Sequence, residues 1–426
     1  MTTAPHHAGQ ARRSDVRRPR VVVVGGGFAG LTAVRMLGER DVDVLLLDRN
    51  AYATFQPLLY QVATGGLNPG DVTFALRAFT GRFSNVRFRR VTVTGVDADG
   101  RHVRTDTGDE IAYDYLILSS GVTANYFGVP GAQEHAKTIY TRGAALEVRD
   151  SLFSNLESVS QDLPSAVEPV FVVVGGGATG VEMAGMLAEM RTSTLPATYP
   201  EIDLDRVRVV LVEMTDDVLG PFDPDIREYA AQELRERGVD LRLATAVKEV
   251  QSDCVVLSDG ERVPSAATIW ATGVKADDRV SQWGLPQGRG GRVEVEPDMR
   301  VVGHPEIFAV GDLGARTDDP LPQLAQPAIQ GGRHAATQII RLLAGMPTYP
   351  MRYRDKGTMA TIGRSDAVVQ FPGGLKLRGL IAWLAWVGLH IVQLTGQRNR
   401  LATLMNLSVR YLAGRGRHNV IVGDPP

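Results

Sequence analysis

Two glycine-rich turns are the segments of the sequence best suited to chemistry. The first is Gly25-x-Gly27-x-x-Gly30 and the second is Gly175-x-Gly177-x-x-Gly180. In this spacing the first glycine permits a tight turn, the second lets the backbone approach a pyrophosphate, and the third lets a helix pack closely on a strand. The phosphates then lie at the helix N-terminus, where free N–H groups and the helix dipole favour anions. The turns therefore predict two dinucleotide sites, with a purely structural glycine loop as the alternative at each.

An acidic residue follows each turn at the end of the next apolar run. Asp48 lies 18 residues after Gly30, where we expect it to accept hydrogen bonds from ribose hydroxyls. Glu213 lies 33 residues after Gly180, because a proline-containing insertion over residues 192–205 lengthens that connection. A carboxylate there accepts from a free ribose 2′-OH and repels a 2′-phosphate. The second site is therefore predicted to take NADH rather than NADPH.

Two dinucleotide sites in one chain are what a flavoprotein reductase needs. A nicotinamide passes electrons only as a hydride, whereas a flavin takes two electrons and can release them singly. We therefore expect non-covalent FAD at one site and NADH as the substrate at the other. Gly311-Asp312 follows the apolar run 307–310 and is a candidate second flavin contact through its carboxylate. A simple turn aspartate is the alternative.

Three further polar residues are candidates for catalysis. Gln326 and Gln330 are four residues apart, so in a helix over residues 326–336 they share a face and could hydrogen-bond one planar ligand. Exposed helix glutamines are the alternative. Glu182 falls in the first turn of the helix after the second glycine turn, where its charge suits the positive helix end. It is either a helix-terminus acid or a group that helps to move protons.

The composition limits the remaining possibilities. The 426 residues are 44% hydrophobic and 22% charged, which is ordinary for a globular protein of two or three domains. A net charge of -2 gives no overall attraction to nucleic acid, and none is expected as a partner. The single cysteine, Cys254, cannot make an internal disulfide, an iron–sulfur site or a structural zinc site. No metal is expected, and electron transfer requires an organic cofactor.

The elements that must position these residues form two βαβ units. Continuous apolar runs at 20–24 and 169–174 enter the two turns, as in parallel strands covered on both faces. Helices are predicted over 31–40 and 181–190, and further strands over 42–47, 115–118, 207–212, 267–270 and 307–310. The predicted fold class is α/β, with two Rossmann-like dinucleotide-binding domains and a C-terminal amphipathic membrane-anchoring segment. The predicted boundaries are a disordered basic leader over 1–18, an FAD-binding domain over 19–139 and 276–345, an NADH-binding domain over 140–275, and a membrane-binding segment over 346–426.

The C-terminal segment differs from the rest of the chain. Between Arg378 and Arg398 lie 19 uncharged residues, but the fully apolar part is only about 15 residues, or about 22 Å of helix, against a hydrocarbon core of about 30 Å. We predict a helix lying in the membrane interface, with Trp383 and Trp386 at the headgroup level. A spanning helix and a buried soluble helix are the alternatives. The bases from 375 to 423, with no acid among them, are expected to face anionic lipid: Lys376, Arg378, Arg398, Arg400, Arg410, Arg415 and Arg417.

At this point the sequence resembles a family, the type II NADH:quinone oxidoreductases of the two-dinucleotide-binding-domain flavoproteins. The segments that carry the resemblance are Phe55-Gln-Pro-Leu-Leu-Tyr60-Gln-Val-Ala-Thr-Gly-Gly-Leu67, Asn125-Tyr-Phe-Gly128, Ala325-Gln326-Pro-Ala-Ile-Gln330-Gly331, Tyr353-Arg-Asp-Lys-Gly-Thr-Met-Ala-Thr-Ile-Gly363 and Ala382-Trp383-Leu-Ala-Trp386. Ser119-Ser120-Gly121 departs from the Ala-Thr-Gly usual in the family. The resemblance extends over nearly the whole chain after the leader.

The resemblance implies that the first site takes FAD and the second takes NADH, and that two electrons pass from the flavin to a membrane quinone, menaquinone or ubiquinone, without proton pumping. It implies that the Gln326 and Gln330 segment lines the place where quinone meets flavin, and that Glu182 lies near the path of nicotinamide and quinone. Phe55 and Tyr60 are candidates to pack on the flavin, with ordinary core packing as the alternative. The residues expected to contact FAD or NADH are Gly25, Gly27, Phe28, Ala29, Gly30, Asp48, Arg49, Gly121, Gly175, Gly177, Gly180, Glu213, Gly273, Asp312, Ala328 and Ile329.

The same resemblance implies a respiratory-chain enzyme attached peripherally to the cytoplasmic face of a bacterial plasma membrane, with a homodimer expected. Two alternatives remain. One is a soluble NADH oxidase or reductase on the same fold, and the other is a flavin-binding redox sensor that turns over poorly. A disulfide reductase is excluded because Cys254 has no partner.

Overall fold

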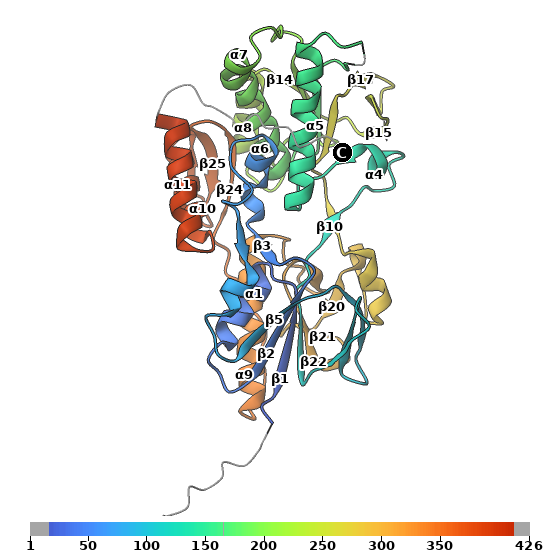
Figure 1. Cartoon of the computed structure of the whole chain (residues 1–426), viewed down its shortest axis with the longest axis vertical. Helices are drawn as coiled ribbons and strands as arrows, with labels where there is room; N and C mark the ends of the chain where they lie inside the picture. The colour runs from blue at the N-terminus through green and yellow to red at the C-terminus, as the bar shows by residue number, and fades with distance from the viewer. Residues whose placement is uncertain (1–16, 165, 413–426) are drawn as a thin grey trace, which may run out of the picture.

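The computed structural model describes residues 17–164 and 166–412 and has two lobes joined at a narrow waist (Figure 1). Most of the predicted leader, together with Arg415 and Arg417, lies outside the described residues. The two sequence pieces of the predicted FAD domain together form the sheet of the lower lobe in Figure 1, and the predicted NADH domain forms the sheet of the upper lobe. The C-terminal helices lie along one side of the upper lobe.

The lower lobe is built on an eight-stranded sheet from two separate pieces of chain. The strand order is β23 (Gly314–Arg316), β20 (Val293–Val295), β21 (Arg300–Val301), β22 (His304–Ala309), β9 (Tyr115–Leu118), β1 (Arg20–Val24), β2 (Asp43–Asp48) and β5 (Val86–Arg90). The central strands are parallel, and β1 pairs with β2 on one side and β9 on the other. Because both of its faces are covered, β1 is almost entirely buried, as its unbroken run of valines predicts.

Two helices of the lower lobe pack directly against each other. They are α1 (Phe28–Leu37), which follows the first glycine turn, and α9 (Ala325–Leu343). A Cβ placed on Gly332 would lie only 2.1 Å from the Ala29 carbonyl oxygen, so the close approach of α9 to α1 requires a glycine there. The start of α9 is thereby fixed beside the first glycine turn.

The upper lobe contains a five-stranded parallel sheet. Its order is β11 (Ala136–Lys137), β18 (Ala267–Trp270), β12 (Val170–Val174), β13 (Arg208–Val212) and β14 (Val239–Arg242). Its helices are α4 (Ala132–His135), α5 (Arg142–Ser160), α6 (Ala178–Glu189), α7 (Leu195–Thr198) and α8 (Pro224–Glu236). Since β11 belongs to this sheet, the sheet begins before residue 140, where the sequence predicted the domain boundary.

Smaller elements complete the lobes. Antiparallel ribbons are formed by β3 (Tyr52–Thr54) with β4 (Thr73–Ala75), by β6 (Val93–Asp97), β7 (His102–Thr105) and β8 (Glu110–Ala112), and by β15 (Val247–Val250), β16 (Cys254–Leu257) and β17 (Arg262–Pro264). The short helix α3 (Leu76–Thr80) packs on the first ribbon, whereas α2 (Leu59–Ala63) packs on α5 and α6 of the upper lobe. Two of the segments that pass between the lobes, β10 (Thr123–Ala124) and β19 (Val274–Lys275), pair antiparallel (Figure 1).

The C-terminal unit is a three-stranded sheet followed by two helices. Its elements are β24 (Thr358–Gly363), β25 (Asp366–Gln370), β26 (Lys376–Arg378), α10 (Gly379–Gln393) and α11 (Gln397–Leu412). Strand β24 packs on α6, where a Cβ on Gly185 would lie 2.0 Å from the Ile362 carbonyl oxygen. The unit is therefore docked on the upper lobe.

Polar contacts also join this unit to α8. Asp366 is buried at the seam, where it accepts hydrogen bonds from the Tyr229 hydroxyl at 3.0 Å and from Arg237 at 3.2 Å. Lys376 lies 2.6 Å from both Asp223 and Asp225, and Arg378 pairs with Asp225. Lys376 and Arg378 were predicted to face anionic lipid; both are paired with acids of the upper lobe, which reduces the charge that they can offer to lipid.

The predicted apolar helix of the tail is present as α10, with one error of orientation. Trp386 was expected at a membrane interface, but it is 1% exposed and faces the core. Its ring stacks on His390 with centroids 3.9 Å apart and meets the Tyr60 ring edge-on at 6.3 Å. The outward face carries other side chains, among them Leu380, Ile381 and Leu384. Within residues 17–164 and 166–412, no helix is both long enough and apolar enough to cross a membrane.

Candidate active site

The first glycine turn has the geometry that its sequence predicts. Gly25 has a φ of +101°, and a Cβ there would lie 2.3 Å from the Ser119 carbonyl oxygen. A Cβ on Gly30 would lie 1.8 Å from the Gly25 carbonyl oxygen, so α1 can begin directly against the strand only with glycine at this position. The Ser119 hydroxyl has one hydrogen to share between the carbonyl oxygens of Val24 and Gly25, which lie 2.8 and 3.0 Å from its oxygen. The departure from the usual family sequence at Ser119 thus adds a hydrogen bond that holds the turn.

The outer side of this turn is open, and an acid stands beside it. No atom lies within 4 Å of a Cβ built on Gly27, so the start of α1 presents free space in front of its N–H groups. Asp48 accepts from the backbone N–H of Gly26 at 2.6 Å and from that of Asn50 at 2.7 Å. Arg49, also predicted at the cofactor, forms an ion pair with Asp277 at 3.7 Å.

A second acid approaches the same region from the other piece of the sheet. A Cβ on Gly311 would lie 3.4 Å from the Cβ atoms of both Ala29 and Ala328, so these three predicted contacts are neighbours. Burial raises the pKa of Asp312 to about 6, and the nearby Arg292 opposes this shift. No described residue donates a hydrogen bond to the Asp312 carboxylate. An open helix start flanked by a turn-bound acid and a buried, unpartnered acid fits the pyrophosphate and hydroxyl groups of FAD.

The second glycine turn has the same backbone geometry as the first. Gly175 has a φ of +110°, a Cβ on Gly180 would lie 1.8 Å from the Gly175 carbonyl oxygen, and a Cβ on Gly177 would meet nothing within 4 Å. Glu213 accepts from the Gly176 N–H at 2.5 Å through one oxygen and from the Thr215 N–H at 2.8 Å through the other. These features fit a second dinucleotide with a free ribose hydroxyl.

Glu182 lies where α6 meets α2 and the C-terminal unit. Helix α6 begins at Ala178, so Glu182 is in its second turn, and the prediction of a first-turn acid at the positive helix end is wrong. The Glu182 carboxylate accepts from the Thr361 N–H of β24 at 3.3 Å, and the indole of Trp386 from α10 makes a weaker polar contact with it. The Tyr60 hydroxyl of α2 lies 3.0 Å from the Thr361 hydroxyl. Glu182 keeps a narrow exposed edge, yet protein atoms crowd its carboxyl group, and this burial raises its pKa to about 8. Glu182 therefore carries a proton at neutral pH.

Aromatic side chains connect this carboxyl group to the first glycine turn. The Phe55 ring meets Phe28 edge-on at 5.7 Å and His390 edge-on at 6.0 Å. His390 Nδ1 lies 2.7 Å from the Trp386 carbonyl oxygen, and burial lowers the pKa of His390 to about 4, so that its ring is neutral. Phe55 and Tyr60 are buried, which agrees with ordinary core packing. Their neighbours are nevertheless residues of the site, since Phe55 contacts Phe28 and Tyr60 contacts Thr361.

The two predicted glutamines are both near the start of α9, but they differ in their partners. Gln326 Oε1 is buried and has no hydrogen-bond partner among the described residues. Gln330 instead donates to the Arg354 carbonyl oxygen at 2.9 Å and accepts from the Arg354 N–H at 3.0 Å. Gln326 is therefore the glutamine whose carbonyl oxygen is left for a ligand, while Gln330 ties α9 to the segment before β24.

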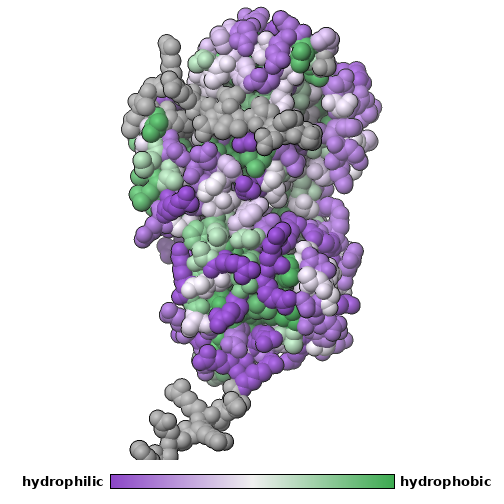
Figure 2. Space-filling model, viewed as in Figure 1, coloured by the Kyte–Doolittle hydropathy of each residue, from purple (hydrophilic) through white to green (hydrophobic). Residues whose placement is uncertain are grey.

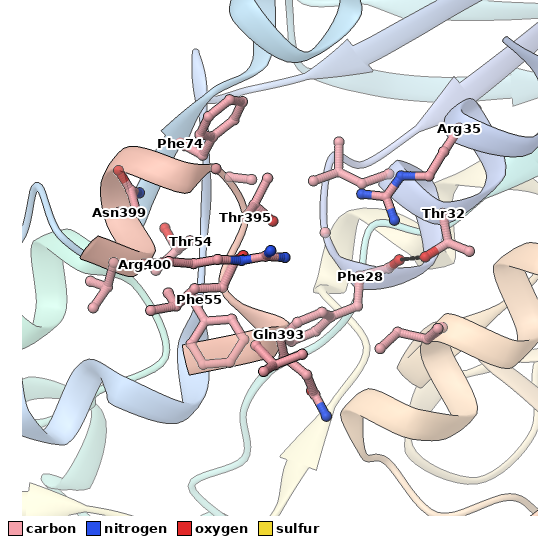
Figure 3. Close-up of a pocket in the computed structure, with 18 of the residues that line it drawn as sticks. Phe28, Thr32, Arg35, Thr54, Phe55, Phe74, Gln393, Thr395, Asn399 and Arg400 are labelled. Atoms are coloured by element: carbon pink, nitrogen blue, oxygen red, sulfur yellow. Dashed lines mark hydrogen bonds between the residues drawn. The ribbon is translucent and has the colours of Figure 1, made fainter. Parts of the chain in front are cut away.

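A pocket of about 690 Å³ opens beside the first glycine turn (Figure 3). One wall is α1, another is the β3–β4 ribbon, and the third is the turn between α10 and α11. Ile329, between the two glutamines, also lines it. Among the residues that line the pocket are Gly27, Phe28, Phe55, Ile329, Val392 and Gln393. The pocket thus connects the cofactor turn and α9 with the C-terminal helices.

Several residues of the site could not be singled out from the sequence. Thr361 lies in a segment that carried the family resemblance, but nothing in its local pattern connects it to Glu182. Phe127, in the Asn125-to-Gly128 segment, covers Gly273 so closely that a Cβ on that glycine would lie 2.8 Å from its ring. Asn125 itself joins the crossing strands, because its carbonyl oxygen accepts from the Trp270 indole at 2.9 Å.

Comparison with known proteins gives a consistent result along the chain. Residues 19–332 match the family described as Pyridine nucleotide-disulphide oxidoreductase, and residues 356–416 match the NDH2 C-terminal domain. The chain is 36% identical to the type II NADH:quinone oxidoreductase Ndh of Mycobacterium tuberculosis, over 94% of this chain and 89% of that protein. It is 30% identical to the internal alternative NAD(P)H-ubiquinone oxidoreductase A1 of Arabidopsis thaliana, over 96% and 87% of the two chains.

The fold is also similar to that of solved structures. NDH2 from Plasmodium falciparum, solved in complex with NADH, superposes with a TM-score of 0.86 at 18% identity, over 94% of this chain and 99% of that one. The superposition includes both lobes and the C-terminal unit, because it covers nearly all of both chains. It confirms the predicted α/β architecture.

Proposed function

The chain belongs to the type II NADH:quinone oxidoreductases, and from this premise we propose that it is a respiratory enzyme held at a membrane surface. Electrons pass from NADH to a quinone, with FAD as the cofactor. When bound, FAD supplies the ring that accepts a hydride from the nicotinamide and then yields two electrons to the quinone. The observation that supports this function is the pair of glycine turns. Each turn has open space at its helix start, and in each a backbone N–H donates to an acid at the end of the next strand.

The first turn is assigned to FAD. The N–H groups at the start of α1, in front of Gly27, would bind the pyrophosphate, and Asp48 would accept from the adenosine ribose. Asp312 would accept from the hydroxyls of the flavin side, which agrees with its burial and its lack of a partner among the described residues. The second turn and Glu213 would hold NADH in the same manner.

Glu182 is assigned to proton delivery. Reduction of a quinone consumes two protons, and an acid of pKa about 8 is protonated at neutral pH and close enough to neutrality to give its proton up. Thr361 and Tyr60 would hold the carboxyl group in place. Gln326 would meet the quinone through both ends of its side-chain amide. The Nε2–H group would donate to a quinone oxygen and stabilise the charge that develops on reduction, and the unpartnered Oε1 would accept from the O–H group of the reduced quinone.

The pocket beside the first turn is assigned to quinone entry. It extends from Ile329, next to Gln326, to the turn between α10 and α11. Exposed apolar side chains continue outward on those helices, and the space-filling view shows hydrophobic residues gathered along the edge of the upper lobe where α11 lies (Figure 2). A quinone dissolved in lipid could therefore reach the site from a membrane on which these helices rest.

The experiment that tests this function follows the flavin absorbance of the purified, FAD-loaded protein under anaerobic conditions. NADH should bleach the flavin, and a ubiquinone or menaquinone analogue should restore its colour within a turnover. A flavin that NADH bleaches but only oxygen restores would instead identify an NADH oxidase, and a flavin that NADH bleaches slowly or not at all would identify a sensor.

Two finer assignments are part of the same proposal. Attachment to the cytoplasmic face of a bacterial plasma membrane would give the enzyme access to both NADH and the quinone pool. A homodimer is predicted as well, and light scattering of the purified protein measures it directly. Both assignments are independent of the chemistry above.

A further inference from the structure

Three arginines gather at the open side of the pocket beside the first glycine turn. Arg35 comes from α1, Arg82 from the turn after α3, and Arg400 from α11, and all three are exposed pocket-lining residues. Figure 3 shows Arg35 and Arg400 extending toward one another from opposite walls. Segments far apart in the sequence thus bring three positive charges to one opening.

Neighbouring groups hold each of these side chains in place. The Arg35 guanidinium carbon lies 5.7 Å from the centre of the Phe79 ring, and that of Arg82 lies 5.3 Å from the centre of the Phe74 ring. Arg400 Nε donates to the Leu394 carbonyl oxygen at 2.8 Å. Because these contacts restrict the side chains before any ligand arrives, less conformational entropy is lost when one binds.

The charge of the cluster is not compensated. The pocket lining contains no aspartate or glutamate, and none of the three arginines forms an ion pair with another described residue. By contrast, Lys376 and Arg378 of the tail are paired with acids. Guanidinium groups match the oxygens of a phosphate in charge and geometry, so the cluster favours a phosphate group.

An apolar surface begins where the cluster ends. Val392 lines the pocket and is 66% exposed, and Leu401 and Met405 of α11 are exposed to similar extents. A ligand that combines a phosphate with apolar chains would satisfy both surfaces at once. We propose that Arg35, Arg82 and Arg400 form a binding site for the phosphate of an anionic phospholipid, whose acyl chains lie along the apolar face of α10 and α11.

This proposal rests on the proposed docking of α10 and α11 at a membrane, and it adds a defined headgroup site that involves the FAD-binding lobe. A lipid held there would fix the pocket opening against the bilayer. The three arginines are exposed and come from α1, α11 and the turn after α3, whereas the quinone ring is assigned to α9, so the proposal gives the headgroup and the ring different residues.

The test measures binding of monomeric dihexanoyl phosphatidylglycerol to the full-length, FAD-loaded protein by calorimetry. Wild type should bind one molecule and prefer it to dihexanoyl phosphatidylcholine. Each of Arg35→Gln, Arg82→Gln and Arg400→Gln should weaken binding about 5-fold, and the triple variant about 100-fold. The matched control removes three exposed arginines outside the pocket, as Arg40→Gln, Arg235→Gln and Arg289→Gln, and should bind as wild type does.

Four results would overturn the proposal. They are wild type without preference for phosphatidylglycerol, equal weakening in the control triple, equally tight binding of inorganic phosphate, and loss of FAD from the arginine triple, which would assign these arginines to the cofactor. The single variants keep the test decisive if the triple variant does not fold. Wild type that reduces quinone but ignores the lipid contradicts only this site, whereas failure to reduce quinone contradicts the proposed function whatever the lipid result.

Discussion

Glu213 combines a structural and a selective role at one residue. One carboxylate oxygen accepts from the Gly176 N–H and the other from the Thr215 N–H, so the carboxylate is fixed at the position where we propose that the ribose of NADH binds. A 2′-phosphate there would meet a like charge at a cost of about 1 to 3 kcal/mol, or about 10- to 100-fold in preference. We therefore expect NADH to be preferred to NADPH by about that factor.

Glu213→Gln should narrow the ratio of kcat/KM for NADH to that for NADPH by about 10-fold, because the charge that repels a phosphate is removed. The amide oxygen keeps only one of the two backbone hydrogen bonds, so kcat/KM for NADH should fall as well. Glu261→Gln, which removes an exposed acid of the same lobe, should leave the ratio unchanged. Equal use of both nucleotides by wild type would contradict the assignment of Glu213.

Glu182 gives the reaction a predicted pH dependence. Its pKa is raised from 4.5 to about 8 by burial, so it holds its proton at neutral pH and loses it as the pH rises through about 8. Quinone reduction should therefore slow above pH 8, while flavin reduction by NADH should not follow that titration. In Glu182→Gln the decline should vanish and the rate should be low at every pH. Stopped-flow measurement of the two half-reactions from pH 6 to 10 checks this.

The same shift predicts a stability effect of defined sign. Between pH 4.5 and about 8 the folded protein binds a proton at Glu182 that the unfolded chain has released. The free energy of unfolding should fall as pH rises through this window, and the contribution of this group to the fall should be absent in Glu182→Gln. If the free energy of unfolding of Glu182→Gln falls with pH as steeply as that of wild type, the Glu182 carboxyl group is ionised at neutral pH.

At the scale of elements, helix α9 carries two glutamines with separable roles. Gln326→Leu should slow quinone reduction about 10-fold or more and leave flavin reduction nearly intact, because only the second substrate would contact it. Gln330→Leu should also slow quinone reduction. Unlike Gln326→Leu, it should lower the free energy of unfolding by about 1 kcal/mol, since both hydrogen bonds to the Arg354 peptide are lost. Equal damage to both half-reactions by Gln326→Leu would mean that this residue holds the flavin or the fold.

The seam between β25 and α8 offers a contrast between buried and exposed charges. Asp366→Asn removes the buried charged partner of Arg237 and leaves it only Glu233 at 3.6 Å, so it should lower the free energy of unfolding by about 2 kcal/mol. Asp225→Asn, at the solvent-exposed end of the same seam, should cost about 1 kcal/mol or less. Chemical denaturation of the two variants in parallel tests this, and equal losses would mean that the C-terminal unit is not held by the buried acid.

The sequence was sufficient for features that depend on neighbours along the chain, and insufficient for those that depend on docking. The two turns, their strands and helices, and the acids at Asp48 and Glu213 follow from local spacing. The partnership of Glu182 with Thr361 does not, because it joins α6 to a strand 179 residues away. Trp386 was assigned to the wrong side because α10 is apolar all round, so its composition could not indicate which face meets the core.

At the scale of the whole molecule, the C-terminal unit both completes the active site and presents the apolar surface proposed to dock on lipid. Deleting the chain beyond Gly374 would remove Trp386 from above Glu182, and activity would be lost for reasons unrelated to a membrane. Surface substitutions separate the two roles. The outward residues Ile381, Leu384 and Met405 are 57 to 67% exposed and contribute nothing to the buried core.

Replacing these three residues by serine should therefore abolish flotation with neutral liposomes, since apolar insertion is lost while the fold is kept. Flotation with anionic liposomes should be weakened but not abolished, because the arginines at the pocket opening remain. Activity with a long-tailed quinone in liposomes should fall far more than activity with a short, water-soluble analogue, because only the former is reached from the bilayer. Serine at Leu163, Val302 and Leu343, which are exposed apolar residues outside the segment 346–426, is the matched control and should float as wild type does. Wild-type protein that stays at the bottom of both gradients would refute the anchor, and equal loss by the two triple variants would place the membrane contact elsewhere on the molecule.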